Sequence, residues 1–513
     1  MKPTEDLFLL IKALTKAEKT NFRLIASAYG RTDKNYLLLF RAIDGQQKYD
    51  EQAIREFFKG ETFLKKLDVT KIYLYNLILQ SLRSFQPSAI PDIRLKNMLI
   101  DVEKLCNKSL FMQAQKILIK AEKLAEKHDK YAFLLEITSW KKRIIKAYPK
   151  AGTIEFSIHS IYKKEEDLIR KLENTLQYEY LEFRMHSLKR TEIHPRTQRA
   201  VAAYNTLMKH PALKNEKKAL TYRSKMSFHW ICSTYAQAKG DYRGMLNAAG
   251  KRLKLAESRL EQPSLNSDYI ECISGYILAC LTTHNFEAAE KCRLQLKEYL
   301  LKFPPKNPNS VQVLKGISEY YFSLLACIYS GDFSRGELII PEAEKWITEN
   351  EKKLNMRVIQ YYYYNISYIY FGLSKYHKAL KWVNRILNNP NNDIENDTHF
   401  FSMLMRLIIH YELGNTELLV SHLNSAWQLM EKKKVKTKFE KIFLSDFEQN
   451  ILNVAAETNT TEGWKRLHGR LVKLFDNPGE KVALDFFDFI SWAESKIQKK
   501  TFQEVVKGKS NIA

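Results

Sequence analysis

The chain has 513 residues, of which 45% are hydrophobic, and its 82 Lys and Arg exceed its 58 Asp and Glu to give a formal net charge of +24. This composition is that of a folded protein and excludes a disordered chain, and the length indicates several domains or one extended array. Only 17 glycines and 13 prolines indicate many helices and few turns. No run approaches the ~20 consecutive apolar residues of a membrane-spanning helix. The apolar patch near the N-terminus is too short for a signal peptide, so we expect a cytoplasmic protein.

Residues 1–88 are predicted to form an N-terminal helical bundle. Thr15 and Glu18 fit a capping box at the start of a helix, and Pro87 and Pro91 close the unit. We interpret the bundle as a cap over the first repeat of a helical array. A small DNA-binding bundle is the alternative, although no helix-turn-helix pattern stands out.

Residues 89–260 are predicted to form helical hairpins and one long helix. A hairpin that turns at 108–111 spans residues 93–127. The spacing of apolar residues predicts a long helix over 158–188 with five side chains near one face, namely Ile161, Leu168, Leu172, Leu176 and Leu181.

A basic stripe lies in the same region, between Trp140 and Lys225, where 20 Lys and Arg stand against 9 Asp and Glu. Such a stripe on a rigid helical array suits an acidic partner: RNA, DNA, an anionic protein or a membrane surface. The alternative is a solvated face of lysine-rich helices. The candidate polyanion-binding residues are Lys141, Lys142, Arg143, Lys163, Lys164, Lys189, Arg190, Arg196, Arg199, Lys214, Lys217, Lys218, Arg223 and Lys225.

Residues 261–433 are predicted to form a series of helical hairpins, most clearly at Tyr361–Leu387. There Gly372 ends the first helix, and Ser374 is predicted to cap the second. Similar corners recur along the chain at steps of 44, 47, 43 and 40 residues, aligned on Tyr242, Phe286, Phe333, Tyr376 and Thr416.

These corners, together with Asn365, Tyr370, Tyr376 and Ala379 at their offsets, resemble the tetratricopeptide repeat. Because the steps exceed the ~34-residue period of that family, the chain resembles a divergent member. The resemblance covers residues 215–430 and, more loosely, 93–128. It implies an all-α superhelical array of antiparallel hairpins with helical caps at both ends.

The resemblance also implies that the first helix of each hairpin lines a concave groove. In the hairpin with the strongest resemblance, Tyr361, Tyr364, Asn365 and Tyr368 would face a bound protein or peptide. Asn365 falls where some family members use an asparagine to hold the backbone or the terminal carboxylate of a peptide.

Residues 434–513 are predicted to form a C-terminal helical cap. The phrases LTKAEKTNFRLIAS and LDFFDFISWAESKI, near the two ends of the chain, resemble uncharacterised helical-repeat proteins of Bacteroidota-type bacteria. No activity can be carried over from these proteins.

The sequence favours no enzyme class and no cofactor. Its six cysteines lie inside helical patterns without a CxxC pair, which predicts buried, reduced thiols and no metal site. A phosphate-binding loop, a glycine-rich dinucleotide turn and a GxSxG elbow are all missing. We therefore expect a non-catalytic scaffold that holds a protein or peptide partner. An RNA-, ribosome- or DNA-associated protein acting through the basic stripe is the alternative.

Overall fold

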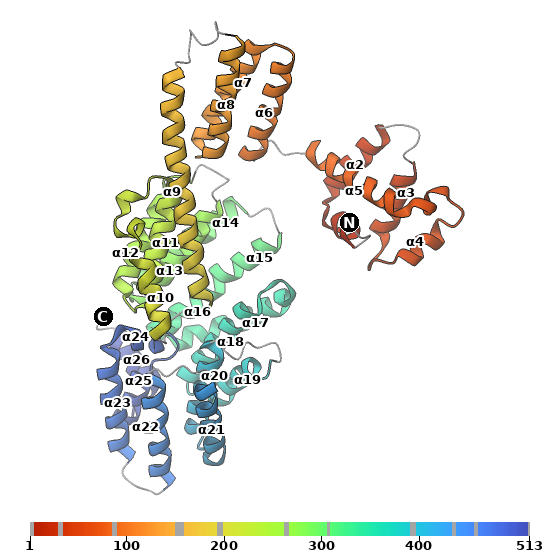
Figure 1. The fold of residues 1–513 in the computed structure, drawn as a ribbon. Helices are drawn as coiled ribbons and strands as arrows, with labels where there is room; N and C mark the ends of the chain where they lie inside the picture. Colours follow the sequence, from red (N-terminus) through yellow and green to blue (C-terminus); the bar gives the residue numbers. More distant parts are fainter. Residues whose placement is uncertain are drawn as a thin grey trace. The chain divides into compact units, whose positions relative to one another are not determined.

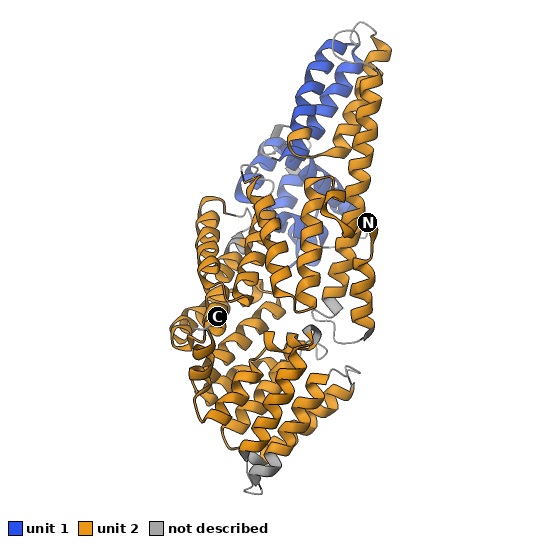
Figure 2. Cartoon of the chain, turned by 90° about the vertical axis from the view of Figure 1, so that its left-hand side faces the viewer, with its two compact units in different colours: residues 1–124 blue, residues 125–513 orange. Residues whose placement is uncertain are grey.

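The computed structural model describes residues 5–28, 34–84, 90–148, 158–191, 198–260, 266–304, 308–389, 397–432, 438–455 and 460–510. Within these ranges every regular element is helical and no strand occurs, so the predicted all-α class is confirmed (Figure 1). No helix in this part of the chain is long and apolar enough to cross a membrane. The chain divides into two compact units, residues 1–124 and 125–513 (Figure 2). The boundaries predicted at 88, 260 and 433 each fall between two helices and stay predictions.

The first unit has its core among its first five α-helices. Phe22 and Phe40 are fully buried there, with ring centroids 4.6 Å apart. The predicted capping box is confirmed, because Thr15 N donates to Glu18 Oε2 at 2.7 Å and Glu18 N donates to Thr15 Oγ1 at 3.3 Å. The elements are α1 (Asp6–Ala13), α2 (Lys16–Ala28), α3 (Lys34–Gly45), α4 (Glu51–Phe57), η1 (Thr62–Lys66), α5 (Leu67–Ser84), α6 (Pro91–Asn107) and α7 (Phe111–Lys127), which reaches into the second unit.

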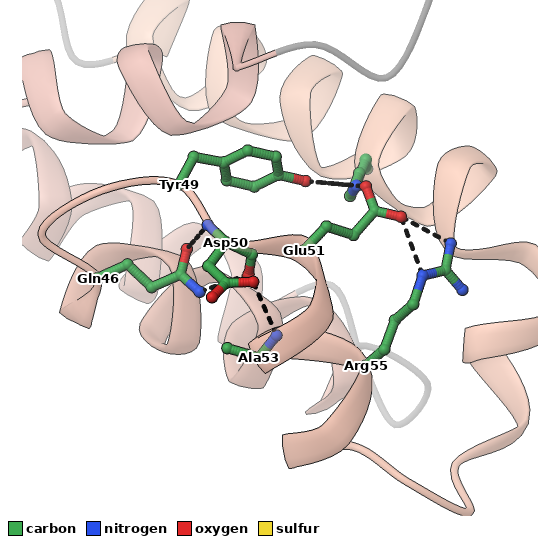
Figure 3. Close-up of polar contacts among 7 residues, drawn as sticks. Gln46, Tyr49, Asp50, Glu51, Ala53 and Arg55 are labelled. Atoms are coloured by element: carbon green, nitrogen blue, oxygen red, sulfur yellow. Dashed lines mark hydrogen bonds and ion pairs between the residues drawn. The ribbon is translucent and has the colours of Figure 1, made fainter.

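Hydrogen bonds fix the loop that leads into α4 (Figure 3). Asp50 caps the helix, since Ala53 N donates to its carboxylate at 3.0 Å. The Gln46 side chain donates to Asp50 O at 2.7 Å and accepts from Asp50 N at 3.2 Å. These two hydrogen bonds to the backbone hold the capping residue in place.

The first turn of α4 carries a buried ion pair. Lys71 Nζ lies 2.5 Å from Glu51 Oε2 and 2.5 Å from Tyr49 Oη, and the lysine side chain is only 6% exposed. Arg55 also donates to Glu51, at 2.9 and 2.7 Å. The hydrogen bond from Lys71 is the main cause that lowers the pKa of Glu51 to about 2. Glu51 therefore neutralises a cation that the core has removed from water.

The second unit is a succession of helices, most of which pack against their neighbours in the chain. They are α8 (Tyr131–Ala147), α9 (Ile158–Thr191), α10 (Gln198–Met208), η3 (Pro211–Lys214), η4 (Glu216–Lys218), α11 (Tyr222–Ala238), α12 (Tyr242–Glu257), α13 (Asn266–Thr282), α14 (Phe286–Lys302), α15 (Pro308–Gly316), η6 (Ile317–Tyr321), α16 (Phe322–Ser330), α17 (Phe333–Asn350), η7 (Glu351–Lys353), α18 (Met356–Gly372), α19 (Tyr376–Leu387), α20 (Asp397–Glu412), α21 (Thr416–Lys432), α22 (Lys438–Ala455), α23 (Thr460–Phe475), α24 (Pro478–Lys481), η8 (Val482–Asp485), α25 (Phe489–Gln498) and α26 (Phe502–Ser510).

The five predicted hairpin corners lie where the sequence places them. Each aligned corner residue is the first residue of a helix, which gives α12, α14, α17, α19 and α21. Two positions earlier the backbone is left-handed in every case, with φ between 57° and 72°, at Gly240, His284, Gly331, Ser374 and Gly414. A left-handed residue just past a helix end lets the following amides bond the last carbonyls, so these residues stop one helix and start the next.

The prediction that Ser374 caps α19 is wrong. Ser374 has a φ of 57°, and its N–H donates to Phe371 O at 2.9 Å, while Lys375 N–H donates to Tyr370 O at 2.9 Å. These bonds close the end of α18, and Lys375 takes the N-cap position of α19. Ser374 thus fills the place that glycine has at three of the other corners.

Small residues allow close helix crossings one turn after the corners. Ala289 and Ala379 are buried at this position. A Cβ built on Gly336 would lie 2.9 Å from Ile369 Cδ1, which is closer than real Cβ contacts. Glycine is therefore required where α17 meets α18.

The long helix is confirmed as α9, but the predicted place of Leu176 is wrong. Ile161, Leu168 and Leu181 are buried, whereas Leu176 is 55% exposed. Glu165 near the start of α9 bonds Thr138 on α8, whereas Tyr178 and His186 further along contact rings on α11, so the buried side shifts around the helix. Leu176 lies on the side that neither set of neighbours covers.

Candidate partner-binding site

The chain's own C-terminal region contacts two of the four predicted groove residues, Tyr364 and Tyr368. Tyr364, Asn365 and Tyr368 on α18 are buried, and Tyr361 is half-buried. Residues Leu484–Asp488, between α24 and α25, lie against Tyr364 and Tyr368. We name these residues the tail segment.

Two tyrosines bind the backbone of the tail segment rather than its side chains. Tyr364 Oη donates to Phe486 O at 3.1 Å, and Asp488 N donates to Tyr368 Oη at 3.1 Å. Both hydroxyls come from neighbouring turns of one helix, and both bond groups that any residue except proline provides. Helix α18 therefore holds the main chain of the turn that follows η8 in a fixed register.

Aromatic rings on α18 and α20 hold the two phenylalanines of the tail segment. The ring of Phe486 stacks on Phe401, with centroids 4.0 Å apart and an interplanar angle of 7°. Phe487 contacts Tyr368 and Phe371, each at 5.2 Å between centroids, and is almost fully buried. The two rings thus enter different aromatic environments, as happens when a groove reads successive side chains of a peptide.

The first acid of the tail segment is held by a tyrosine far away in the sequence. Tyr242 Oη donates to Asp485 Oδ1 at 2.6 Å. Burial raises the pKa of Asp485 to about 7, against the opposing effects of this hydrogen bond and of nearby Lys481. Ionised Asp485 in turn raises the pKa of Tyr329, which burial already raises. The carboxyl group at this position therefore changes its charge near neutral pH.

Asn365 keeps an unused donor in the same helix. The residue is only 7% exposed, and its Nδ2 has no hydrogen-bond acceptor among the described residues. Asn365 is four residues after Tyr361 and three before Tyr368, so the three share one side of α18. A carbonyl or carboxylate reaching this amide would gain a hydrogen bond that the chain itself does not supply.

A second polar network anchors the helix that follows the tail segment. Glu412 at the end of α20 accepts from Trp492 Nε1 at 2.6 Å, from Lys496 Nζ at 2.5 Å and from Tyr376 Oη at 3.2 Å. A cavity of about 290 Å³ adjoins it, and Lys499 is in its wall. This network fixes α25 to the end of α20 and the start of α19.

The tail segment was missed by sequence reasoning, which assigned it to a C-terminal cap. The available signal was its order of residues, two adjacent phenylalanines between Asp485 and Asp488. Two acids beside two large apolar residues indicate a segment that is held by specific partners. The pattern does not say that those partners lie on α12, α18 and α20.

Six of the fourteen residues of the predicted basic stripe are engaged within the chain. Ion pairs join Lys142 to Glu165 at 2.8 Å, Lys164 to Glu126 at 2.6 Å, and Arg223 to Asp268 at 3.8 Å. Lys141 is buried, Arg143 lies over the ring of Trp140, and Lys189 lies over that of Trp230, where burial lowers its pKa. Of the remainder, Lys163 and Arg199 are exposed and Lys225 is half-buried; Arg196 and the side chain of Arg190 lie outside the described residues.

Three lysines of the stripe are exposed together on one short connection. Lys214 belongs to η3 and Lys217 and Lys218 to η4, between α10 and α11. The Asn174 side chain on α9 fixes this connection, since its amide donates to Lys218 O at 2.8 Å and accepts from Leu220 N at 2.9 Å. The three lysines are thus presented to solvent on a rigid backbone.

A larger cavity of about 530 Å³ opens among α10, α11 and α12. His229 in its wall is buried and lies 3.1 Å from Glu216 Oε1. Burial raises the pKa of the Cys232 thiol to about 11, so this thiol is not activated as a nucleophile. All six cysteines are free, and four of them are buried. No group of three or more His, Cys, Asp or Glu in the described ranges could hold a metal ion.

The chain matches no protein-family model and no curated protein. The resemblance to tetratricopeptide repeats therefore stays a prediction.

Proposed function

We propose that the protein is a non-catalytic scaffold that binds a short segment of a protein partner against α18 and α20. In this proposal the hairpins form a capped superhelical array of tetratricopeptide type, acting in the bacterial cytoplasm without a cofactor. The partner segment takes the position of the tail segment and shares its chemistry: acidic residues beside aromatic residues.

The observation that carries the proposal is that Tyr364 and Tyr368 bind a backbone carbonyl and a backbone amide. Hydrogen bonds to backbone groups supply affinity that does not depend on the partner's side chains, and side-chain contacts then supply specificity. The ring of Phe401, which stacks on Phe486, and the hydroxyl of Tyr242, which bonds the carboxyl group of Asp485, are contacts of this kind. The unpartnered amide of Asn365 offers one further bond to a partner.

The tail segment competes with any partner, because it belongs to the same chain. An intramolecular competitor acts at an effective concentration of the order of millimolar. A partner then binds with an apparent affinity reduced by the fraction of molecules whose tail segment is released. Weakening the tail segment should consequently strengthen binding in trans.

We expect Phe486→Ala to bind a labelled peptide of the sequence ALDFFDF about tenfold more tightly than the wild-type chain does, which corresponds to about 1.4 kcal/mol. The substitution removes the ring that stacks on Phe401 and leaves the binding surface unchanged. Fluorescence polarisation with the full-length chain measures the affinity.

Two controls accompany this titration. Phe57→Ala truncates an exposed phenylalanine of the first unit and should bind like the wild type. Asn365→Ala in the Phe486→Ala background should keep the melting temperature and lose up to about tenfold in affinity, because its Nδ2 makes no bond within the chain. Equal affinity of Phe486→Ala and wild type, or no binding by either, would show that the tail segment only closes the fold.

A second candidate function, RNA binding, is favoured by the exposed lysines on the connection between α10 and α11. If they contact phosphates, the logarithm of affinity falls linearly with the logarithm of salt concentration. Replacing Lys214, Lys217 and Lys218 with Gln should flatten that slope by up to about 3 units. Filter binding of mixed-sequence RNA at several salt concentrations measures the slope.

The matched control replaces three exposed lysines elsewhere in the second unit, Lys345, Lys352 and Lys381, with Gln. This variant has the same net charge and should keep the wild-type slope. If both triple variants change the slope alike, the binding reports overall charge, and absence of RNA binding at low salt removes this candidate.

A further inference from the structure

Helix α9 carries an exposed apolar stripe on the side away from its neighbours. We name it the outer stripe, and its members are 47–76% exposed: Tyr162, Ile169, Leu176, Tyr180 and Phe183. The opposite side of the helix is buried on α8, α10 and α11. Large contiguous apolar patches on a folded protein mark interaction sites.

Four members of the outer stripe recur at the interval of one core position of a coiled coil. Tyr162, Ile169, Leu176 and Phe183 follow one another at steps of seven residues. A seven-residue apolar repeat keeps one seam facing a partner helix over several turns. From Tyr162 to Phe183 the seam is about 32 Å long, at 1.5 Å per residue.

We propose that the outer stripe is a self-association surface, on which α9 of a second copy of this chain packs antiparallel to the first. The order of the four seam residues is aromatic, aliphatic, aliphatic, aromatic, which is symmetric about a point between Leu172 and Glu173. A two-fold axis through that point places Tyr162 opposite Phe183 of the second copy, and Ile169 opposite Leu176. Such a self-complementary patch is what a two-fold dimer uses.

Charges beside the seam favour the antiparallel arrangement. Glu173 is exposed, and the two-fold axis brings it within about 3 Å, along the helix, of the level of Arg170 of the second copy. Arg170 is 68% exposed and pairs with Asp167 in its own chain, so it can reach Glu173 of the second copy at little cost.

The parallel arrangement is disfavoured by the same residues. In register it would set Glu166 against Glu166 in the seam, and like charges facing each other destabilise pairing. Both arrangements bring Glu173 close to Glu173 of the second copy, but only the antiparallel one also places an Arg170 of each chain beside this pair. The antiparallel arrangement does bring Lys163 near Arg184 of the second copy at each end. Both residues are exposed, and Arg184 lies over the ring of Tyr180, so this repulsion is solvated and weak.

The first test measures molar mass by sedimentation equilibrium on the full chain over a range of concentrations. We expect a dimer for the wild type and half that mass for Leu176→Lys, which places a charge in the middle of the seam. Leu338→Lys changes a leucine on α17 that is even more exposed than Leu176, and this variant should remain a dimer. A wild-type chain that is monomeric at every concentration overturns the proposal, and so does a dimer that Leu176→Lys leaves intact.

A charge exchange tests the predicted ion pair. Glu173→Arg should raise the dimer dissociation constant about tenfold, since two Arg170–Glu173 pairs become repulsive. Adding Arg170→Glu restores opposite charges and should recover the wild-type constant. A double variant as weak as the single one contradicts the antiparallel register.

Disulfide cross-linking fixes the direction of the two helices. Residue 173 lies next to the two-fold axis, about 1.5 Å along the helix from its copy, whereas residue 183 lies about 32 Å from its copy. Under mild oxidation Glu173→Cys should form a covalent dimer that a reductant separates, and Phe183→Cys should not. The wild type controls for its own six cysteines. Cross-linking of Phe183→Cys would show a parallel pair and overturn the proposal.

Discussion

Phe333→Ala is expected to lower the free energy of unfolding of the second unit by about 3–5 kcal/mol. Phe333 is fully buried at the corner where α17 begins. Its ring stacks on Phe502 at 5.9 Å between centroids and lies 6.1 Å from the ring of Tyr368. Gly372 closes the site, since a Cβ there would lie 2.3 Å from the ring of Phe333. Truncation therefore leaves a cavity whose walls belong to three separate helices.

Tryptophan fluorescence during chemical denaturation measures this effect on the second unit alone, because all seven tryptophans lie beyond residue 124. Leu338→Ala, in which an 80% exposed side chain of the same helix is truncated, should unfold like the wild type. Tyr376→Ala should cost less than Phe333→Ala, since Tyr376 at the next corner is half-buried. Unfolding of Phe333→Ala at the wild-type denaturant concentration would contradict the burial of this ring.

Glu51→Ala is expected to destabilise the first unit by about 3–5 kcal/mol, because it leaves the buried ammonium of Lys71 without its counter-charge. Tyr49 Oη remains as a neutral hydrogen-bond partner, which does not compensate a buried cation. Hydrogen exchange of the α4 and α5 amides measures the loss, and the tryptophan transition of the second unit should not move.

Two further variants separate the buried charge from the surface contact. Lys71→Met in the Glu51→Ala background removes the unpaired cation and should restore most of the stability. Arg55→Ala removes an exposed partner of Glu51 and should cost less than about 1 kcal/mol. Because the pKa of folded Glu51 is lowered to about 2, its contribution is present above about pH 4.5 and disappears as the pH falls through 2. Wild type and Glu51→Ala should therefore converge in strong acid.

Local features of the fold could be predicted from the sequence, because neighbouring residues determine them. Three helices begin at Tyr242, Phe286 and Phe333. Each of these positions is predicted by a turn signal and an aromatic residue a few positions apart. The capping box at Thr15 is of the same kind. No such signal predicts the left-handed backbone of Ser374. Serine is a preferred residue at helix N-caps, so its position in the corner indicated a cap instead.

The features that depend on distant residues were beyond sequence reasoning. Whether Leu176 is buried depends on where α8 and α11 meet α9. The spacing of apolar residues within α9 gives no information about those positions. Two of the residues predicted to line a groove on α18, Tyr364 and Tyr368, are covered by residues more than 100 positions later in the chain. Only the folded chain shows that the acids and rings of the tail segment meet Tyr242 and Phe401.

The contact between Tyr242 and Asp485 joins residues 243 positions apart, which has a consequence for biosynthesis. Helices α18 and α20 leave the ribosome well before the residues that cover them. At about 5–20 residues per second, the stretch from Phe401 to Asp488 takes of the order of 4–17 s to translate. Throughout that time an aromatic surface made for Phe486 and Phe487 stays open on the nascent chain. The second unit thus completes its fold late in synthesis, and in the interval chaperones that bind exposed aromatic surface have access to it.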